Sequence, residues 1–241
     1  MRYIISDIHG CYEEYMELLE KIHFGLRDEL YVLGDAMDRG PEPVRVMQDL
    51  MMRENVTYMV GNHDYMAMLA LRKLAVEITE ETCQELKSED LLHYYYWMQD
   101  GGRVTAEQFR GISWEEQQEI LEYLGEALLY EVLQEGEEQF VLVHAGLGHF
   151  AEEKALEDYD ISDLIFERTD YKRRYYADKR KTIVTGHTPT MTIRPDRQPL
   201  IYRENGHIAV DCGAVFGGHL AAWCVETGEA VYVKSRRERQ F

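Results

Sequence analysis

The stretch Leu30-Tyr31-Val32-Leu33-Gly34-Asp35-Ala36-Met37-Asp38-Arg39-Gly40 joins an apolar run to a charged loop between two glycines. The apolar residues at its start predict a buried strand over residues 30–33. Glycine permits the sharp backbone turn that must follow such a strand. In open α/β sheets, ligands bind beyond the carboxyl ends of the strands, so this loop lies where such a fold builds a site.

The same succession of strand, loop and helix surrounds this stretch. Residues 3–5 predict a buried strand, and apolar residues from Tyr12 to Ile22 recur on one face of a helix. A second amphipathic helix follows Gly40, and residues 56–60 predict a third strand. This β-α-β-α-β order predicts an α/β fold with a parallel sheet and crossover helices.

The remainder of the chain divides into a helical part and a strand-rich part. Residues 66–129 are mostly helical in pattern and include the aromatic cluster Tyr94-Tyr95-Tyr96-Trp97, which we attribute to packing among these helices. We therefore expect one α/β domain over residues 1–241, with a helical insertion at about 66–129. Later strands are expected at residues 129–134, 140–143, 182–185, 207–210, 220–225 and 230–233.

The composition limits the class of protein. The 241 residues include 26 Lys and Arg against 45 Asp and Glu, a net charge of −19 that disfavours binding to nucleic-acid polymers. No apolar run approaches the roughly 18 residues that cross a bilayer, and no signal-peptide pattern begins the chain. The four cysteines lack paired spacing, which is typical of reduced thiols. We expect a cytoplasmic protein without a membrane partner.

Five clusters of Asp, His and Asn follow five of the predicted strands. Because ligands gather at the carboxyl ends of such strands, we expect these side chains to meet at one rim. Taken singly, each cluster also fits a helix cap, a turn or a structural histidine, and their occurrence in order on strand ends favours a site. The clusters are Asp7-Ile8-His9-Gly10, the loop Gly34 to Gly40, Gly61-Asn62-His63-Asp64, His144-Ala145-Gly146 and Gly186-His187.

These side chains are candidate metal ligands. They offer oxygen and imidazole nitrogen without thiolate, a donor set that suits divalent manganese, iron or zinc. Six ligands are too many for one catalytic ion with an open position, and they suit two ions that share one carboxylate. The six candidates are Asp7, His9, Asp35, Asn62, His144 and His187.

In combination, the motifs resemble those of the phosphoprotein phosphatases, a branch of the calcineurin-like metallophosphoesterases. The family pattern Asp-x-His-Gly, Gly-Asp-x-x-Asp-Arg-Gly, Gly-Asn-His-Glu/Asp, His-x-Gly and Gly-His is present between Asp7 and His187. The segment from Asp211 to Gly218, and Asp100-Gly101-Gly102, resemble segments of bacterial and phage members. The resemblance implies an αββα sandwich.

The resemblance also implies roles for the matching residues. Asp7 and His9 would bind one metal ion, Asn62, His144 and His187 the other, and Asp35 would bridge them. His63, oriented by Asp38, would be the general acid, and Arg39 and Arg168 would bind the phosphate. We expect manganese at both positions, with iron, zinc or nickel as alternatives. A hydroxide that bridges the two ions would attack phosphorus directly, so no covalent intermediate is expected.

The implied activity is that of a metal-dependent phosphomonoesterase acting on phosphorylated proteins or peptides, at serine or threonine and also at tyrosine. Pro189 stands where many nucleases of the wider group have a second histidine, which favours a phosphatase. Asp64 is shared with symmetrical diadenosine tetraphosphatases, so hydrolysis of that dinucleoside polyphosphate is the enzymatic alternative. The intact Asp38-Arg39-Gly40 is less usual in those enzymes. A non-catalytic phosphate-binding module is a further alternative, which would require a broken site.

Lysines and arginines gather between residues 172 and 181 of this acidic chain. They fit either a solvated surface before a strand or a positive rim that attracts a phosphorylated segment to the site. In the second case, changing Lys172, Arg173 and Arg174 to Glu would raise KM for a phosphopeptide more than for a small aryl phosphate.

Overall fold

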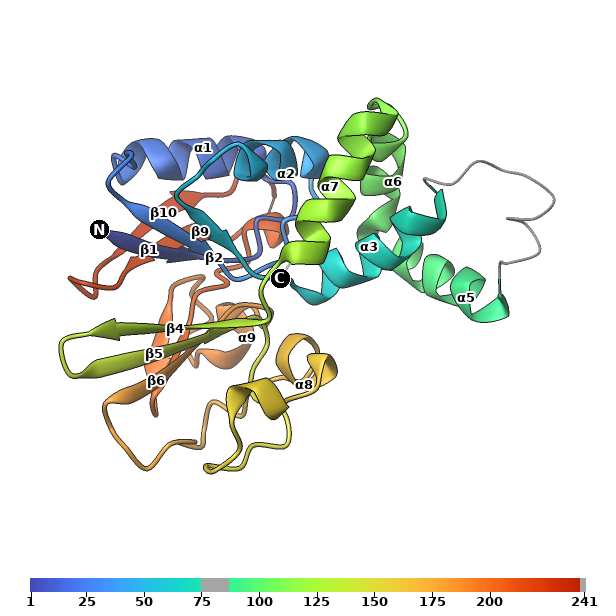
Figure 1. Cartoon of the computed structure of the whole chain (residues 1–241). Coiled ribbons are helices and arrows are strands. Elements are labelled where there is room, and N and C mark those ends of the chain that lie inside the picture. Colours follow the sequence, from blue (N-terminus) through green and yellow to red (C-terminus); the bar gives the residue numbers. More distant parts are fainter. Residues whose placement is uncertain (75–86, 239–241) are drawn as a thin grey trace.

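The computed structural model describes residues 1–74 and 87–238 (Figure 1). Its centre consists of two five-stranded sheets. In the first sheet, of order β10-β9-β1-β2-β3, the strands β1, β2 and β3 run parallel, as the sequence predicts, and β9 joins β1 antiparallel. Its strands are β1 (Arg2–Ile5), β2 (Glu29–Val32), β3 (Val56–Tyr58), β9 (His219–Cys224) and β10 (Ala230–Lys234).

The second sheet has the order β4-β5-β6-β8-β7. Strands β5, β6 and β8 run parallel, and a hairpin adds β4 antiparallel to β5 at one edge. Strand β7 was not predicted, because Arg203 and Glu204 are exposed charged residues that give this short strand no apolar pattern. The strands are β4 (Tyr130–Glu135), β5 (Glu138–Val143), β6 (Lys181–Thr185), β7 (Tyr202–Glu204) and β8 (His207–Ala209).

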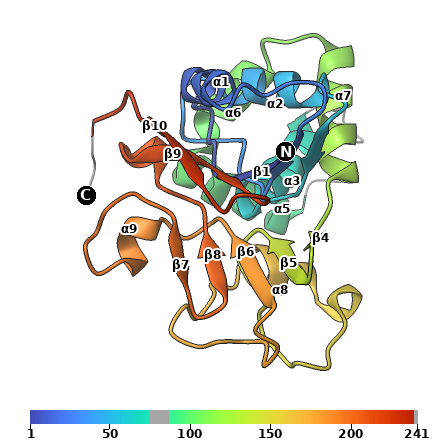
Figure 2. The same cartoon turned by 90° about the vertical axis from the view of Figure 1, so that its left-hand side faces the viewer.

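The two sheets pack face to face through an apolar layer (Figure 2). Ile4 lies in this layer, and the rings of Phe140 and Trp223, one from each sheet, are 5.1 Å apart. The neighbouring Ile5 belongs instead to the cluster on the outer face of the first sheet. Because consecutive side chains of a strand point to opposite faces, both faces of this sheet need cover.

Helices supply that cover. Helices α1 (Tyr12–Lys21) and α2 (Pro43–Met51) lie over the outer face of the first sheet (Figure 2), where Leu18 and Met47 are fully buried. On the second sheet, the short helix α8 (Ile161–Ile165) and adjoining loops pack against Val141 and Ile183. The succession of helix, sheet, sheet and helix confirms the expected αββα sandwich. Further short helices are η2 (Leu156–Asp158), α9 (Thr190–Ile193) and η3 (Ala214–Phe216).

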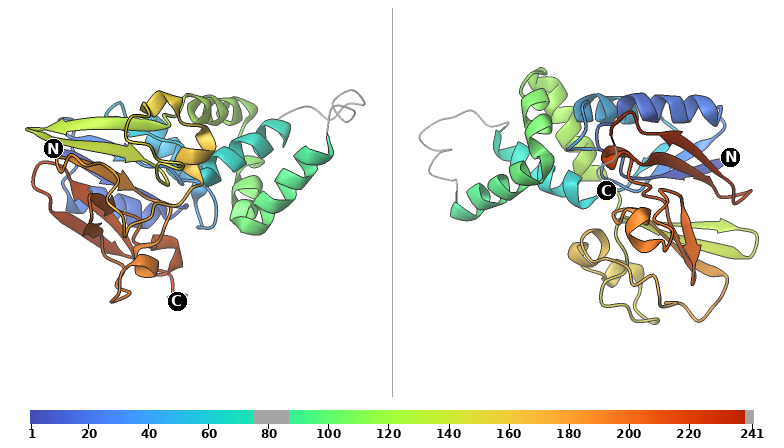
Figure 3. Two further views of the ribbon diagram at one scale, coloured as in Figure 1. Left: turned by 90° about the horizontal axis from the view of Figure 1, so that it is seen from below. Right: turned by 180° about the vertical axis from the view of Figure 1, so that it is seen from behind.

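The helices expected between residues 66 and 129 stand to one side of the sandwich (Figures 1 and 3). They are present in the described residues, whereas 75–86, including Cys83, lie outside them. In the described part of the chain, no helix is long and apolar enough to cross a membrane. The elements are α3 (Asn62–Leu74), α5 (Ser88–Trp97), the π-helical turn η1 (Met98–Gly102), α6 (Arg103–Phe109) and α7 (Trp114–Glu126).

Candidate active site

The five clusters of Asp, His and Asn meet where the two sheets end. The segments after β1 and β2 of the first sheet, the start of α3 after β3, and the segments after β5 and β6 of the second sheet carry them. The predicted rim is therefore present, but two sheets form it rather than one. Five of the six candidate ligands, Asp7, His9, Asp35, Asn62 and His144, are buried, and His187 is partly buried.

Several of these residues have left-handed backbone conformations, which L-amino acids avoid at a cost of about 1–3 kcal/mol each. The Asp64 carboxylate holds one such loop by accepting hydrogen bonds from the backbone N–H groups of Asp35 and Gly61, at 2.6 and 2.9 Å. Gly61 leaves room for this approach, since a Cβ there would lie 2.0 Å from Oδ1 of Asp35. The non-glycine residues of the five clusters with φ between 44° and 71° are Asp7, His9, Asp35, Asp38, Arg39 and His187.

The Asp35 carboxylate lies at the centre of the cluster. Its Oδ2 is 3.6 Å from Nε2 of His9 and 3.4 Å from Nε2 of His144. One group of potential ligand atoms, all within 4.8 Å of one another, contains His9, Asp35 and His63, and a second contains Asp35, His144 and His187. One carboxylate thus belongs to two groups of potential metal ligands, as a bridging ligand must.

Backbone carbonyls orient two of the histidines. Nδ1 of His9 lies 2.7 Å from the carbonyl oxygen of Met37, and Nδ1 of His144 lies 2.6 Å from that of Leu33. With Nδ1 held in this way, Nε2 of each ring faces Asp35. Histidines that bind metals usually have such a partner on the second nitrogen.

Asn62 and Asp7 complete the set of candidate ligands. Oδ1 of Asn62 is 3.0 Å from Nε2 of His144 and 2.8 Å from Nδ1 of His187. Oδ1 of Asp7 is 4.0 Å from Nε2 of His9, and its other oxygen accepts hydrogen bonds from the Ser6 hydroxyl and the backbone N–H of His187. Asp7 therefore lies beside the first group of ligands rather than within it.

Burial and mutual charge set the protonation of the cluster. Burial opposes ionisation of Asp35, but His144 and His63 outweigh it and hold the pKa of Asp35 well below its usual value. Against the effect of burial, Asp35 raises the pKa of His144 to about 10. Burial and then the charge of Asp35 raise the pKa of Asp7 to about 6. A bound divalent cation would relieve the repulsion between the carboxylates of Asp7 and Asp35.

His63 and Asp38 form a buried pair at the edge of the cluster. Nδ1 of His63 is 2.8 Å from Oδ2 of Asp38, which also accepts a hydrogen bond from Nε1 of Trp97 at 2.8 Å. The Thr105 hydroxyl donates to the other carboxylate oxygen at 2.7 Å. Nε2 of His63 is buried without a hydrogen-bond partner in the described residues. An imidazole held by a carboxylate on one nitrogen and open on the other can transfer a proton.

A pocket of about 270 Å³ opens over the cluster. Arg39 and Arg168 both line it, so the two arginines predicted to bind phosphate face the same space as Asp35 and His63. Nη1 of Arg39 lies 3.0 Å from Nε2 of His9. The full lining is Asp35, Arg39, Asn62, His63, Asp100, Arg168, His187, Pro189, Thr192, Asp211 and Phe216.

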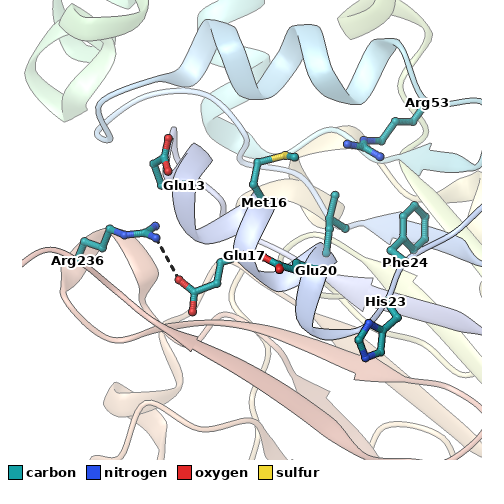
Figure 4. Close-up of a pocket in the computed structure, with 9 residues that line it drawn as sticks. Glu13, Met16, Glu17, Glu20, His23, Phe24, Arg53 and Arg236 are labelled. Carbon is teal, nitrogen blue, oxygen red and sulfur yellow. Dashed lines mark hydrogen bonds and ion pairs between the residues drawn. The ribbon is translucent and has the colours of Figure 1, made fainter.

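A larger groove lies on the outer face of α1 (Figure 4). It measures about 840 Å³, and an ion pair between Arg236 and Glu17 spans part of it. Its lining contains none of the candidate site residues: it consists of Glu13, Met16, Glu17, Leu19, Glu20, His23, Phe24, Arg53 and Arg236.

Four further side chains belong to the site, and the sequence did not identify them as such. Trp97, which we attributed to packing, is buried but also binds Asp38, as does Thr105. Asp100 and Asp211 line the pocket. The signals for these two were the short segments that resemble bacterial family members, which suggested no role for either carboxylate.

Three of the basic residues between 172 and 181 lie away from the end of the second sheet that carries His187. Lys181 begins β6, whose other end leads to His187. The Arg174 guanidinium lies against Gly206, just before β8, and the carbonyl oxygen of Arg173 accepts a hydrogen bond from Nε2 of His207. The positions of Arg173, Arg174 and Lys181 therefore favour the interpretation as a solvated surface over that of a positive rim at the site.

Comparisons with known proteins identify a family and several relatives. The sequence model described as Calcineurin-like phosphoesterase matches residues 3–222. The bis(5'-nucleosyl)-tetraphosphatase PrpE (asymmetrical) of Halalkalibacterium halodurans is 28% identical over 97% of this chain and 94% of its own length. The protein of the same name from Geobacillus thermodenitrificans is 30% identical over 91% of this chain and 88% of its own. A symmetrical bis(5'-nucleosyl)-tetraphosphatase of Buchnera aphidicola is 47% identical, but over 26% of this chain and 23% of its own.

Solved structures share the fold at low sequence identity. A protein provisionally named a diadenosine tetraphosphatase aligns with a TM-score of 0.62 and 18% identity, over 98% of this chain and 94% of that one. A protein serine/threonine phosphatase of Saccharomyces cerevisiae aligns with a TM-score of 0.57 and 12% identity, over 99% of this chain and 80% of that one. At such identities, the likeness concerns the fold alone.

Proposed function

The chain belongs to the calcineurin-like phosphoesterase family, and we propose that it is a two-metal phosphohydrolase whose principal substrates are phosphorylated proteins or peptides. The observation that carries this proposal is the position of Asp35. Its carboxylate lies in both groups of potential metal ligands, and Asp35 lines the same pocket as Arg39, Arg168 and His63. Cation ligands, guanidinium groups and a proton donor around one space are what phosphoryl transfer to water requires.

In the proposed site, Asp7 and His9 would hold one divalent cation, Asn62, His144 and His187 the other, and Asp35 would belong to both. The donor set fits such cations, because oxygen and imidazole nitrogen occur without thiolate, and because carbonyls hold the Nδ1 atoms of His9 and His144. Manganese is the first candidate, and iron, zinc and nickel are alternatives. When bound, the cations would neutralise phosphoryl charge and lower the pKa of water.

The protein's own side chains would bind the substrate and handle the proton. Arg39 and Arg168 would bind phosphoryl oxygens, for which the planar guanidinium group is suited. As the bond from phosphorus to the leaving oxygen breaks, His63 would donate the proton on Nε2 to that oxygen, while Asp38 stabilises the ring at Nδ1. The products would be an alcohol and inorganic phosphate.

We further propose that residues 1–241 form one catalytic domain, with the helical insertion at about 66–129 completing the site. Trp97 and Thr105 support this view, because these two insertion residues bind Asp38. Asp100, from the turn between α5 and α6, pairs with Arg39.

Dinucleoside tetraphosphates are a second candidate class of substrate. The names of relatives that match 97% and 91% of the chain favour it. Those names specify asymmetrical cleavage, whereas the sequence motifs alone suggested the symmetrical reaction. Cleavage of the central bond yields two nucleoside diphosphates, and cleavage of an outer bond yields a monophosphate and a triphosphate, so the products distinguish the two reactions.

One panel of kcat/KM values with saturating Mn²⁺ tests the proposed function. Its substrates are peptides phosphorylated on serine, threonine or tyrosine, diadenosine tetraphosphate and phenyl phosphate. We expect the phosphopeptides to give the highest values. A higher kcat/KM for diadenosine tetraphosphate would favour dinucleoside tetraphosphates as the principal substrates. Binding of a phosphopeptide without turnover of any substrate would indicate a phosphate-binding module and overturn the proposal.

A further inference from the structure

Asp100 connects the insertion to two residues of the proposed reaction. Its Oδ1 is 3.0 Å from Nη2 of Arg39, and its Oδ2 is 3.4 Å from Nε2 of His63. About half of the Asp100 side chain (53%) is exposed, and it lines the pocket. One carboxylate thus stands between the phosphate-binding arginine and the proton donor.

The backbone holds Asp100 in this place. The carbonyl oxygen of Gly101 accepts a hydrogen bond from the backbone N–H of Arg39 at 3.0 Å. Gly101 has a φ of +106°, and a Cβ there would lie 2.6 Å from Cγ of Arg39, so the turn and the arginine are in close contact. The position of the Asp100 carboxylate is therefore coupled to that of Arg39.

This position is on the leaving-group side of the proposed site. In the proposed reaction, Nε2 of His63 donates its proton to the leaving oxygen. The side chains around Nε2 therefore lie next to the rest of the leaving group. Asp100 places a negative charge there. A carboxylate attracts leaving groups with positive neighbours and repels those that carry phosphates.

We propose that Asp100 is a specificity-determining residue that selects leaving groups by charge. It favours an alcohol within a neutral or basic peptide and disfavours a nucleotide or an acidic peptide. This inference rests on the proposed function and deepens it, because it names the kind of phosphopeptide that the site accepts.

The expected effect is moderate, because Asp100 is half exposed. A unit charge about 6 Å away at an effective dielectric constant of about 60 changes kcat/KM by roughly fivefold. Salt screens such interactions, so the effect should shrink between low ionic strength and 1 M salt, where the Debye length falls to about 3 Å. A loss of packing alone would show no such dependence on salt.

The experiment uses the full chain loaded with Mn²⁺ and three phosphoserine peptides of equal length, with Lys, Ala or Glu on both sides of the phosphoserine. The wild-type protein should rank them Lys, Ala, Glu in kcat/KM at low salt. Asp100→Asn should reduce the ratio between the Lys and Glu peptides by roughly fivefold or more. Asp100→Glu keeps the charge and should keep most of the ratio. Glu115→Gln is the control, because Glu115 is an exposed acid that does not line the pocket. This variant should keep the wild-type ratio of kcat/KM between the Lys and Glu peptides.

Two outcomes would overturn the inference. One is an unchanged ratio in Asp100→Asn. The other is an equal loss for all three peptides, which would show that Asp100 only supports Arg39. Turnover of phenyl phosphate by the wild-type protein is measured first, because its absence contradicts the proposed function itself. Turnover with an unchanged peptide ratio contradicts this inference alone.

Discussion

Nδ1 of His63 lies 2.8 Å from Oδ2 of Asp38, and both side chains are buried. Asp38 is held in turn by Trp97 and Thr105, so its carboxylate accepts hydrogen bonds from three side chains. These contacts fix the orientation of the imidazole and leave Nε2 toward the pocket. The proposed acid is thus positioned by residues from the sandwich and from the insertion together.

His63→Asn should lower kcat for phenyl phosphate by about 10²–10⁴-fold, the usual contribution of a general acid. The loss should be smaller with p-nitrophenyl phosphate, because p-nitrophenolate is a weaker base and leaves without a proton. Measured metal content should equal that of the wild-type protein.

Two results would contradict the role of His63. Equal losses with both aryl phosphates would exclude proton donation to the leaving group. Loss of metal would instead identify His63 as a metal ligand. Its ring is close enough for that, because His63 lies in one group of potential ligands with His9 and Asp35.

Thr105→Val should lower kcat with phenyl phosphate by roughly two- to tenfold. It removes the hydrogen bond that the hydroxyl donates to the Asp38 carboxylate, worth about 0.5–1.5 kcal/mol, and also the one that it accepts from the backbone N–H of Asp38. KM should change little, since Thr105 does not line the pocket. Thr105→Ser restores the hydroxyl and should restore kcat. If Thr105→Ser is as impaired as Thr105→Val, the methyl group rather than the hydrogen bond matters. Thermal melts of both variants check that the fold is retained.

Removal of metal should abolish turnover and lower the melting temperature. Cations that bind the folded state stabilise it by mass action, and they also relieve the repulsion between Asp7 and Asp35. After treatment with a chelator and dialysis, added Mn²⁺ should restore kcat and raise Tm together. Full activity of a preparation shown to be free of metal by elemental analysis would refute the two-metal proposal.

Asp35→Asn should lose both metal ions, whereas Asp7→Asn should lose one. Asp35 lies in both groups of potential ligands, whereas Asp7 lies in neither, and its Oδ1 is 4.0 Å from Nε2 of His9 in the first group. Elemental analysis after gel filtration gives the stoichiometry, and the Mn²⁺-dependent rise in Tm gives an independent measure. Two ions retained in Asp35→Asn would exclude the bridging role.

The positions of the candidate ligands could be predicted because their signals are local. Asp7, Asp35 and Asn62 each follow an apolar strand within a few residues, and the carboxyl ends of strands are where α/β folds build sites. The glycines beside them mark the turns. This pattern places the ligands at the carboxyl ends of their strands, and that position does not depend on which sheet each strand joins.

The division into two sheets was implied by the family resemblance alone. The periodicity of the strands could not predict it, because it depends on contacts between distant segments. Ile4 pairs with Trp223 from near the other end of the chain. The contact between Asp100 and Arg39 was equally hidden, since the two residues are 61 positions apart in sequence. Trp97 shows the same limit: its aromatic character predicts burial, but its hydrogen bond to Asp38 is set by the folded insertion.

Glu226→Gln should lower the free energy of unfolding by about 1 kcal/mol at pH 7, after allowance for solvent screening. Burial opposes ionisation of Glu226, but its hydrogen bonds with the side chain and backbone of Arg2 outweigh it and lower its pKa to about 2. A depressed pKa contributes stability that is present above the unfolded pKa of about 4.5 and is lost as the pH falls toward about 2. The difference between Glu226→Gln and wild type in urea unfolding should therefore shrink from pH 7 to pH 3. Glu229→Gln in the same turn serves as the control. If Glu226→Gln differs from wild type in free energy of unfolding by the same amount at pH 7 and pH 3, packing rather than charge links this turn to β1.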